Sequence, residues 1–172
     1  MAKGNLEEKL NGYNRSVAIG QLGGLATTAA GVFNADKIAK YVPGVEGLLN
    51  KSYNVAGYNF NLGLPIFGAI SNFIGDQLGF AASLYANNRE RYKGFSGKFK
   101  FMKDGFNLGM RHLGSYFVSY PLAIATSTAL AATGLVTGAV ATVLPYIVES
   151  IITGFGYMRS TKGYRKQLAS SA

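Results

Sequence analysis

The 172-residue chain contains 48% hydrophobic and only 15% charged residues, and its formal net charge is +9. Ordinary soluble domains contain about 25% charged residues, so this composition favours a membrane protein. The absence of cysteine excludes disulfides and thiolate metal sites, and the single histidine excludes a multi-histidine metal site within one chain.

The first predicted element is an uncharged run at residues 16–35 that is rich in Ala, Gly and Thr. A signal peptide is the competing interpretation, but the preceding stretch is acidic as well as basic and no clean A-x-A cleavage site follows. We therefore expect a retained membrane span. Residues 36–56 are predicted to form an external loop that lies either flat at the membrane surface or in solvent.

A second span is predicted for residues 62–86, with one acid, Asp76, inside it. Residues 87–107 are predicted to form a basic cytoplasmic loop in which Phe and Tyr are interleaved with Lys and Arg. RNA-binding segments show the same mixture. Beside membrane spans, an interfacial belt that contacts anionic lipid headgroups explains the mixture better. We expect the lipid bilayer, and not nucleic acid, to be the partner of this segment.

The longest stretch without a charged side chain is Leu113–Val148. About 20 helical residues, each rising ~1.5 Å, cross a hydrocarbon core of ~30 Å, so this stretch is too long for one span. Gly134 and Gly138 permit a tight turn between two spans. We predict the third span at residues 108–133, the fourth at 136–158, and a basic cytoplasmic tail at 159–172.

The positions of the basic residues predict the orientation of these four spans. Fourteen of the Lys and Arg residues fall on one side of the membrane and three on the other. Because positive residues are enriched in cytoplasmic loops, both termini are expected in the cytoplasm of a cell whose inner membrane holds the protein. The fold class that we predict is an all-α polytopic membrane protein with four transmembrane helices.

The two halves of the chain show a weak similarity to each other. In each half one span begins near an arginine, Arg15 or Arg111, and the next span contains one acid, Asp76 or Glu149. A basic, Tyr-containing segment follows each acid-containing span. This pattern is typical of a two-plus-two internal repeat, although chance resemblance explains it about as well.

Asp76 and Glu149 are the candidate functional acids. A bare carboxylate in hydrocarbon costs at least ~2.5–3.5 kcal/mol, so such residues usually face a partner or a water-filled cavity. The functional interpretation is a pair that accepts a proton or a cation, or that binds a substrate amine, with Asn72 and Gln77 lining the same cavity. The alternative is that the acids are structural and pair with Arg15 or Arg111, or that they lie near the interface.

Arg111 and His112 open the third span. The pair could bind a carboxylate or phosphate, helped by the positive end of the helix dipole. Alternatively, each is a topological anchor that snorkels to the headgroups.

Three small-residue spacings predict close packing between helices. They are Gly20-x-x-x-Gly24, Gly75-x-x-x-Gly79 and Gly134-x-x-x-Gly138. The second spacing flanks Asp76, so that face of the second span is expected to meet another helix.

Residues 61–166 resemble two families of small four-span proteins. Leu84-Tyr85 before Arg89 and Arg91, Ser119-Tyr120-Pro121 in the third span, and Gly154-Phe155-Gly156-Tyr157 before Arg159 are similar to the alanine-exporter (AlaE-type) family. Asn87-Asn88-Arg89 is similar to the Asn-Arg exit of the GtrA-like family of lipid-linked-sugar translocases. The resemblance implies a two-plus-two membrane architecture and a transport function.

The leading functional hypothesis is a small secondary transporter, expected to be a homo-oligomer, that exports or flips a small polar or amphiphilic solute. Asp76 and Glu149 would carry charge and Arg111 would bind an anion. Because the sequence contains no P-loop, nucleophile elbow, zinc motif or dinucleotide fingerprint, we expect neither an enzyme nor a cofactor. The alternatives are a non-transporting membrane subunit or scaffold, and a viral or envelope structural membrane protein.

Overall fold

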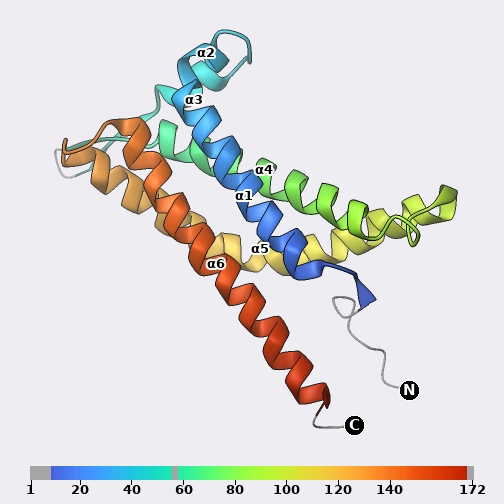
Figure 1. The fold of residues 1–172 in the computed structure, drawn as a ribbon. Coiled ribbons are helices and arrows are strands. Elements are labelled where there is room, and N and C mark those ends of the chain that lie inside the picture. Colours follow the sequence, from blue (N-terminus) through green and yellow to red (C-terminus); the bar gives the residue numbers. More distant parts are fainter. Residues whose placement is uncertain (1–8, 56–57, 170–172) are drawn as a thin grey trace.

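Four long helices form most of the structure, and short elements connect the first two (Figure 1). The computed structural model describes the backbone of residues 9–55 and 58–169, and the side chains of residues 9–54, 60–109 and 116–154. In chain order the elements are α1 (Tyr13–Phe33), α2 (Ala35–Ala39), α3 (Val45–Leu49), β1 (Ser52–Val55), β2 (Tyr58–Asn61), α4 (Gly63–Asn87), α5 (Gly94–Ala132) and α6 (Gly138–Ala169). The chain is therefore mostly helical, in agreement with the predicted all-α class.

Among the described residues, α1 is the one helix that is both long enough and apolar enough to cross a membrane by composition. Shorter apolar helical stretches cover Tyr116–Ala132 and Gly138–Gly154. Helix α4 has 25 residues, enough for a span, but its Asn, Asp, Gln and Ser side chains lower its mean hydropathy.

A small β-hairpin between α3 and α4 was not expected from the sequence. Its strands pair antiparallel, from Ser52 opposite Asn61 to Val55 opposite Tyr58. Tyr, Val and Phe favour strands because they pack well on a pleated surface. Here they alternate with Asn and Ser, but each strand has only four residues. Such short stretches do not predict a hairpin in an otherwise helical chain.

Helix α5 begins much earlier than predicted. It starts at Gly94 and has 39 residues, or ~58 Å at ~1.5 Å per residue. Most of the segment that was predicted to be a cytoplasmic loop, residues 87–107, is therefore helical. Gly94 has a φ of 70°, a left-handed conformation that glycine adopts readily, and it turns the chain out of α4. Beyond this glycine no proline precedes Pro121, so the helix continues.

The tightest packing in the molecule joins α1 and α4, which run antiparallel along their full lengths. Gly23 lies against the backbone of Gly75 and Gly79, and Gly20 lies against Asp76. Side chains at these glycines would collide with the facing helix. The predicted close approach at Gly20-x-x-x-Gly24 and Gly75-x-x-x-Gly79 is thus confirmed.

Hydrogen bonds between polar side chains and backbone atoms follow the α1–α4 contact from end to end. Ser16 Oγ donates to Ser83 Oγ at 3.2 Å, and Thr27 Oγ1 donates to the carbonyl of Ser71 at 2.7 Å. At the end near the N-terminus, Asn88 exchanges two hydrogen bonds with the backbone of Asn11, at 2.9 and 3.0 Å. Helices α1 and α4 therefore form one closely bound pair.

Helices α5 and α6 meet at a short turn and then diverge (Figure 1). Gly134 makes the turn with a φ of 68°, and an added Cβ there would meet nothing within 4 Å. The turn that was predicted here is confirmed. The predicted helix packing at Gly134 is wrong, because this residue lies outside both helices.

The beginning of α5 is held against the end of α4 by an ion pair and an apolar cluster. Arg91 donates to Asp104 Oδ2 from Nε at 2.9 Å and from Nη2 at 2.8 Å. Tyr92 is buried beside them, stacks on Tyr85, and packs edge-on against Phe101.

Candidate functional site

Asp76 lies in the middle of α4, on the face that meets α1. Its side chain is only 4% exposed. Gln21 of α1 donates to Asp76 Oδ2 from Nε2 at 3.4 Å, and Gly20 provides the space that the carboxylate occupies. The close packing of α1 on α4 therefore buries Asp76, and its one hydrogen bond to a described side chain is this long contact with the Gln21 amide.

Glu149 reaches the same region from α6 and is 8% exposed. Thr153 donates to its Oε1 at 3.0 Å, and Ser150 donates to its Oε2 at 3.4 Å. Helices α4 and α6 pack against each other, so the two predicted acids reach the same part of the interior although they lie on different helices. Gln21 also lies next to Gly154 of α6, so α1, α4 and α6 meet at this point.

Neither acid has a cationic partner among the residues whose side chains the structure describes. The ion pairs found there join Arg91 to Asp104 and Lys93 to Glu90, both near the start of α5. Arg15, one of the proposed partners, is exposed in the first turns of α1. The side chains of Arg111 and His112 lie outside the described residues, although their backbone is part of α5.

The two predicted amides contact tyrosines of α5. Tyr120 donates from its hydroxyl to Asn72 Oδ1 at 3.0 Å, and Gln77 Nε2 donates to the Tyr116 hydroxyl at 3.3 Å. Asn72 is buried one helical turn before Asp76, and its Nδ2 has no hydrogen-bond partner among the described residues. Asn72 thus adds an unused donor to the interior near Asp76, whereas Gln77 faces α5.

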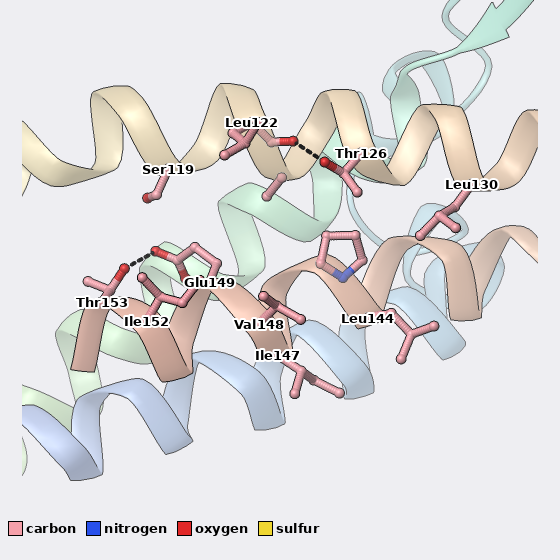
Figure 2. A pocket seen from close by; sticks show the side chains of 12 residues that line it. Ser119, Leu122, Thr126, Leu130, Leu144, Ile147, Val148, Glu149, Ile152 and Thr153 are labelled. Atoms are coloured by element: carbon pink, nitrogen blue, oxygen red, sulfur yellow. Dashed lines mark hydrogen bonds between the residues drawn. The ribbon is translucent and has the colours of Figure 1, made fainter. Parts of the chain in front are cut away.

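A groove of about 450 Å³ lies between α5 and α6 (Figure 2). Glu149 and Thr153 line it from α6, and Ser119 lines it from α5. The rest of its lining is almost entirely aliphatic. The groove therefore gives the buried acid region an apolar approach, not a continuous polar one.

Sequence reasoning did not identify Gln21, Tyr116, Tyr120, Tyr146 or Ser119 as site residues. All five are polar residues within apolar runs, and this was the available signal. Tyr146 is fully buried and donates to the carbonyl of Pro65 at 3.0 Å, which joins α6 to the start of α4. The hydrogen bonds of Tyr116 and Tyr146 join residues 39 and 81 positions apart in the chain. They depend on how the helices are aligned with each other, which composition does not reveal.

No protein-family model matches the chain, and no curated protein or solved structure is significantly similar to it. What the site can do therefore follows from its own chemistry. Two buried carboxylates that have no cationic partner among the described side chains can accept a proton or bind a small cation such as a protonated amine, because each of these neutralises charge in a low-dielectric interior.

Proposed function

We propose that the chain is a small integral membrane carrier that exports or flips a small polar or amphiphilic solute. Asp76 and Glu149 form its charge-carrying site. The observation that carries this proposal is their convergence from α4 and α6 at a buried position that has no cationic partner among the described side chains. A purely structural pair of acids would be expected to have a compensating Arg or Lys.

Four membrane spans are part of the proposal, formed by α1, α4, the second half of α5 and the first half of α6. The distribution of side chains supports them. Ser16, Thr28, Asn72 and Thr142 are almost fully buried. Large apolar side chains point outward on all four helices, among them Leu22, Ile70, Leu78, Phe117, Val118 and Ile151. An apolar exterior around a polar interior suits a lipid solvent.

The proposed setting is the inner membrane of a cell, with both termini in the cytoplasm. The excess of Lys and Arg on one side of the four spans supports this orientation. We further propose a homo-oligomer, anionic lipid headgroups as the partner of the basic segment around the start of α5, and Arg111 as an anion-binding residue. The resemblance to two-plus-two transporter families supports the same architecture.

A non-transporting membrane subunit or scaffold is the second candidate function. The specific observation in its favour is the α1–α4 contact, whose glycines and hydrogen bonds hold the two helices at close approach. In that case the polar interior would stabilise the bundle, and the outward apolar faces would bind a partner protein.

Transport by the purified protein in liposomes tests the two functions against each other. The solute panel contains labelled L-alanine, other small amino acids and alkylamines. We expect Asp76→Asn and Glu149→Gln to abolish movement of any transported solute without changing oligomer size or thermal stability, because the amides keep the shape and lose the charge. Glu90→Gln is the matched control, since its ion pair with Lys93 is exposed and such pairs contribute only ~0–1 kcal/mol.

The scaffold becomes the better interpretation under a different result. If no solute moves and the two amide variants lower the melting temperature, the acids are structural. Wild-type transport by the double variant would refute a role for the acids altogether.

A further inference from the structure

The groove between α5 and α6 is elongated. Its lining is mostly aliphatic, and its charged residue lies at one end. Along α6 it extends from Leu144 to Thr153, a distance of ~14 Å at ~1.5 Å per residue. Leu130 and Leu144 line the end near the Gly134 turn, and Ser119, Glu149 and Thr153 line the opposite end (Figure 2). The shape matches a linear molecule with one polar end.

The polar end has unused hydrogen-bonding capacity. Ser119 Oγ is buried and has no hydrogen-bond partner among the described residues. The Glu149 carboxylate accepts from Thr153 and Ser150, but an ionised carboxylate offers about four acceptor sites. Both groups lie in the same space between the helices, where Figure 2 shows the Ser119 side chain directed toward α6. A buried polar group without a partner costs ~1–3 kcal/mol, so a ligand that satisfies these atoms would be stabilised.

The remaining wall offers no further unused donor and no further charge to a ligand. Thr126, the other hydroxyl in the groove, donates to the carbonyl of Leu122 at 2.8 Å, so its hydrogen is already used. Glu149 is the single ionisable residue in the lining. The groove therefore combines one negative charge with an apolar channel and excludes an anionic head by repulsion.

We propose that this groove binds a single-chain amphiphile with a primary ammonium head. The head donates to Glu149 and Ser119, and the alkyl chain extends along α6 toward Leu144. This inference rests on the proposed carrier function and names the class of solute that the carrier takes. An acyl chain of bulk lipid would leave the free acceptor sites of Glu149 and the Ser119 hydroxyl unused, and the carboxylate of a fatty acid would be repelled by Glu149. For these reasons we commit to the ammonium head.

Calorimetric titration of the full-length protein in nanodiscs tests the proposal, with dodecylamine as the probe and dodecanoate as its anionic counterpart. An alkylamine is protonated near pH 7, like the Lys side chain with its pKa of about 10.4. After subtraction of binding to empty nanodiscs, we expect saturable binding of dodecylamine and none of dodecanoate. Glu149→Gln is expected to weaken dodecylamine binding at least tenfold, and Ser119→Ala by a smaller factor.

A second pair of variants keeps Glu149 and tests the apolar part of the groove. Thr126→Trp fills the groove and is expected to weaken binding at least tenfold. Leu78→Trp introduces the same side chain on the outer face of α4, where Leu78 is 65% exposed, and is expected to bind like the wild type. This pair decides the question even if Glu149→Gln does not fold.

The outcomes separate this inference from the carrier function. Equal binding of dodecanoate and dodecylamine, or dodecylamine binding that is insensitive to both Glu149→Gln and Thr126→Trp, overturns the groove inference even if transport requires the acids. Groove-dependent binding of dodecylamine without any transport overturns the carrier function and leaves the ligand class standing.

Discussion

Gly75 shows how little space separates α1 from α4. A Cβ at this residue would collide with the carbonyl oxygen of Gly23 and with the side chain of Thr27. Thr27 is itself held by its hydrogen bond to Ser71, so it cannot move aside freely. The contact therefore tolerates no side chain at Gly75, although alanine is normally the better helix former.

We expect Gly75→Ala to lower the free energy of unfolding by ~1–3 kcal/mol, the usual range for overpacking. Gly105→Ala is the matched control, because a Cβ at Gly105 of α5 would meet nothing within 4 Å. The control should be neutral or stabilising by up to ~1 kcal/mol through helix propensity. Thermal unfolding of both variants in detergent measures the difference, and equal melting temperatures would contradict the packing described here.

Tyr92 predicts a loss of stability in alkaline solution. Burial, followed by the charge of Asp104, raises the pKa of Tyr92 from 10.0 to about 12. Because the folded protein holds this proton more tightly than the unfolded chain, the contribution to stability is complete below pH 10 and is lost as the pH rises from 10 to about 12.

Melting temperatures measured from pH 8 to 11.5 test this expectation. Tyr92→Phe removes the ionisation and should flatten the alkaline part of the curve relative to the wild type. Tyr41→Phe is the control, since Tyr41 is 84% exposed. Identical alkaline curves for the wild type and Tyr92→Phe would show that this proton does not contribute.

Part of the candidate site could be predicted at this scale. The cost of a carboxylate in an apolar run was sufficient to select Asp76 and Glu149. It was insufficient to identify Gln21 as the partner of Asp76, because that contact joins residues 55 positions apart and depends on the register of α1 against α4. The hydrophobicity pattern predicts which polar residues are buried, but it does not predict which of them contact each other.

Among the elements, α5 presents the clearest unpaired surface. The side chains of Phe95, Phe99, Met102 and Phe106 are all more than half exposed. Their spacing of four, three and four residues places them on one helix face, opposite the buried residues Gly97, Asp104 and Leu108. Lys98 and Lys103 flank this aromatic stripe on its two sides. Such an arrangement of apolar and basic side chains is typical of helices that lie at a membrane surface.

We expect the aromatic stripe to contact the headgroups of an anionic bilayer. The chain lacks cysteine, so an environment-sensitive dye can be attached at Met102→Cys alone. Its emission should shift further to the blue in nanodiscs with anionic lipid than in neutral ones. Near-surface Lys residues contribute ~1 kcal/mol each, so Lys98→Gln with Lys103→Gln should reduce the difference. Emission that is independent of lipid charge would refute the electrostatic contact.

Element boundaries were predicted unevenly. The expected spans at residues 16–35 and 62–86 fall within a few residues of α1 and α4, because both are long apolar runs. The one proline in them, Pro65, lies in the first turn of α4, where proline is tolerated. The start of α5 was missed because Gly94, Gly97 and the surrounding charges were interpreted as a loop. The helical spacing of Phe95, Phe99, Met102 and Phe106 indicated a helix here, and it outweighs the two glycines and the charges.

For the whole molecule, the proposed topology gives a direct test. Single cysteines near Lys3, Val45, Lys98, Thr137 and Ser171 can be labelled from outside intact cells with a membrane-impermeant reagent. We expect labelling near Val45 and Thr137 only, because the excess of Lys and Arg lies on the other side. Labelling near Lys98 and not near Val45 would reverse the orientation, and labelling that fails to alternate would contradict four spans.

The two halves that the sequence suggested are packed very differently. Helices α1 and α4 touch through glycines and backbone hydrogen bonds, whereas α5 and α6 share a turn and leave a groove between them. Similar charge positions in the two halves therefore did not predict similar packing. The difference arises from side-chain size, since the facing residues of α5 and α6 include Leu122, Leu144 and Val148 in place of glycine.

The α1–α4 contact also has a consequence for biosynthesis. Gln21 and Asp76 are 55 residues apart in the chain, so a ribosome that adds ~5–20 residues per second makes the second of them ~3–11 s after the first. During this interval α1 exists without α4. Gln21 therefore lacks its Asp76 partner, and Ser16 and Thr28 keep their hydrogen bonds to the carbonyls of Gly12 and Gly24. The partner of α1 arrives before any of α5 or α6 exists. The α1–α4 pair can thus assemble before the later helices are made, and α5 and α6 are then added to it.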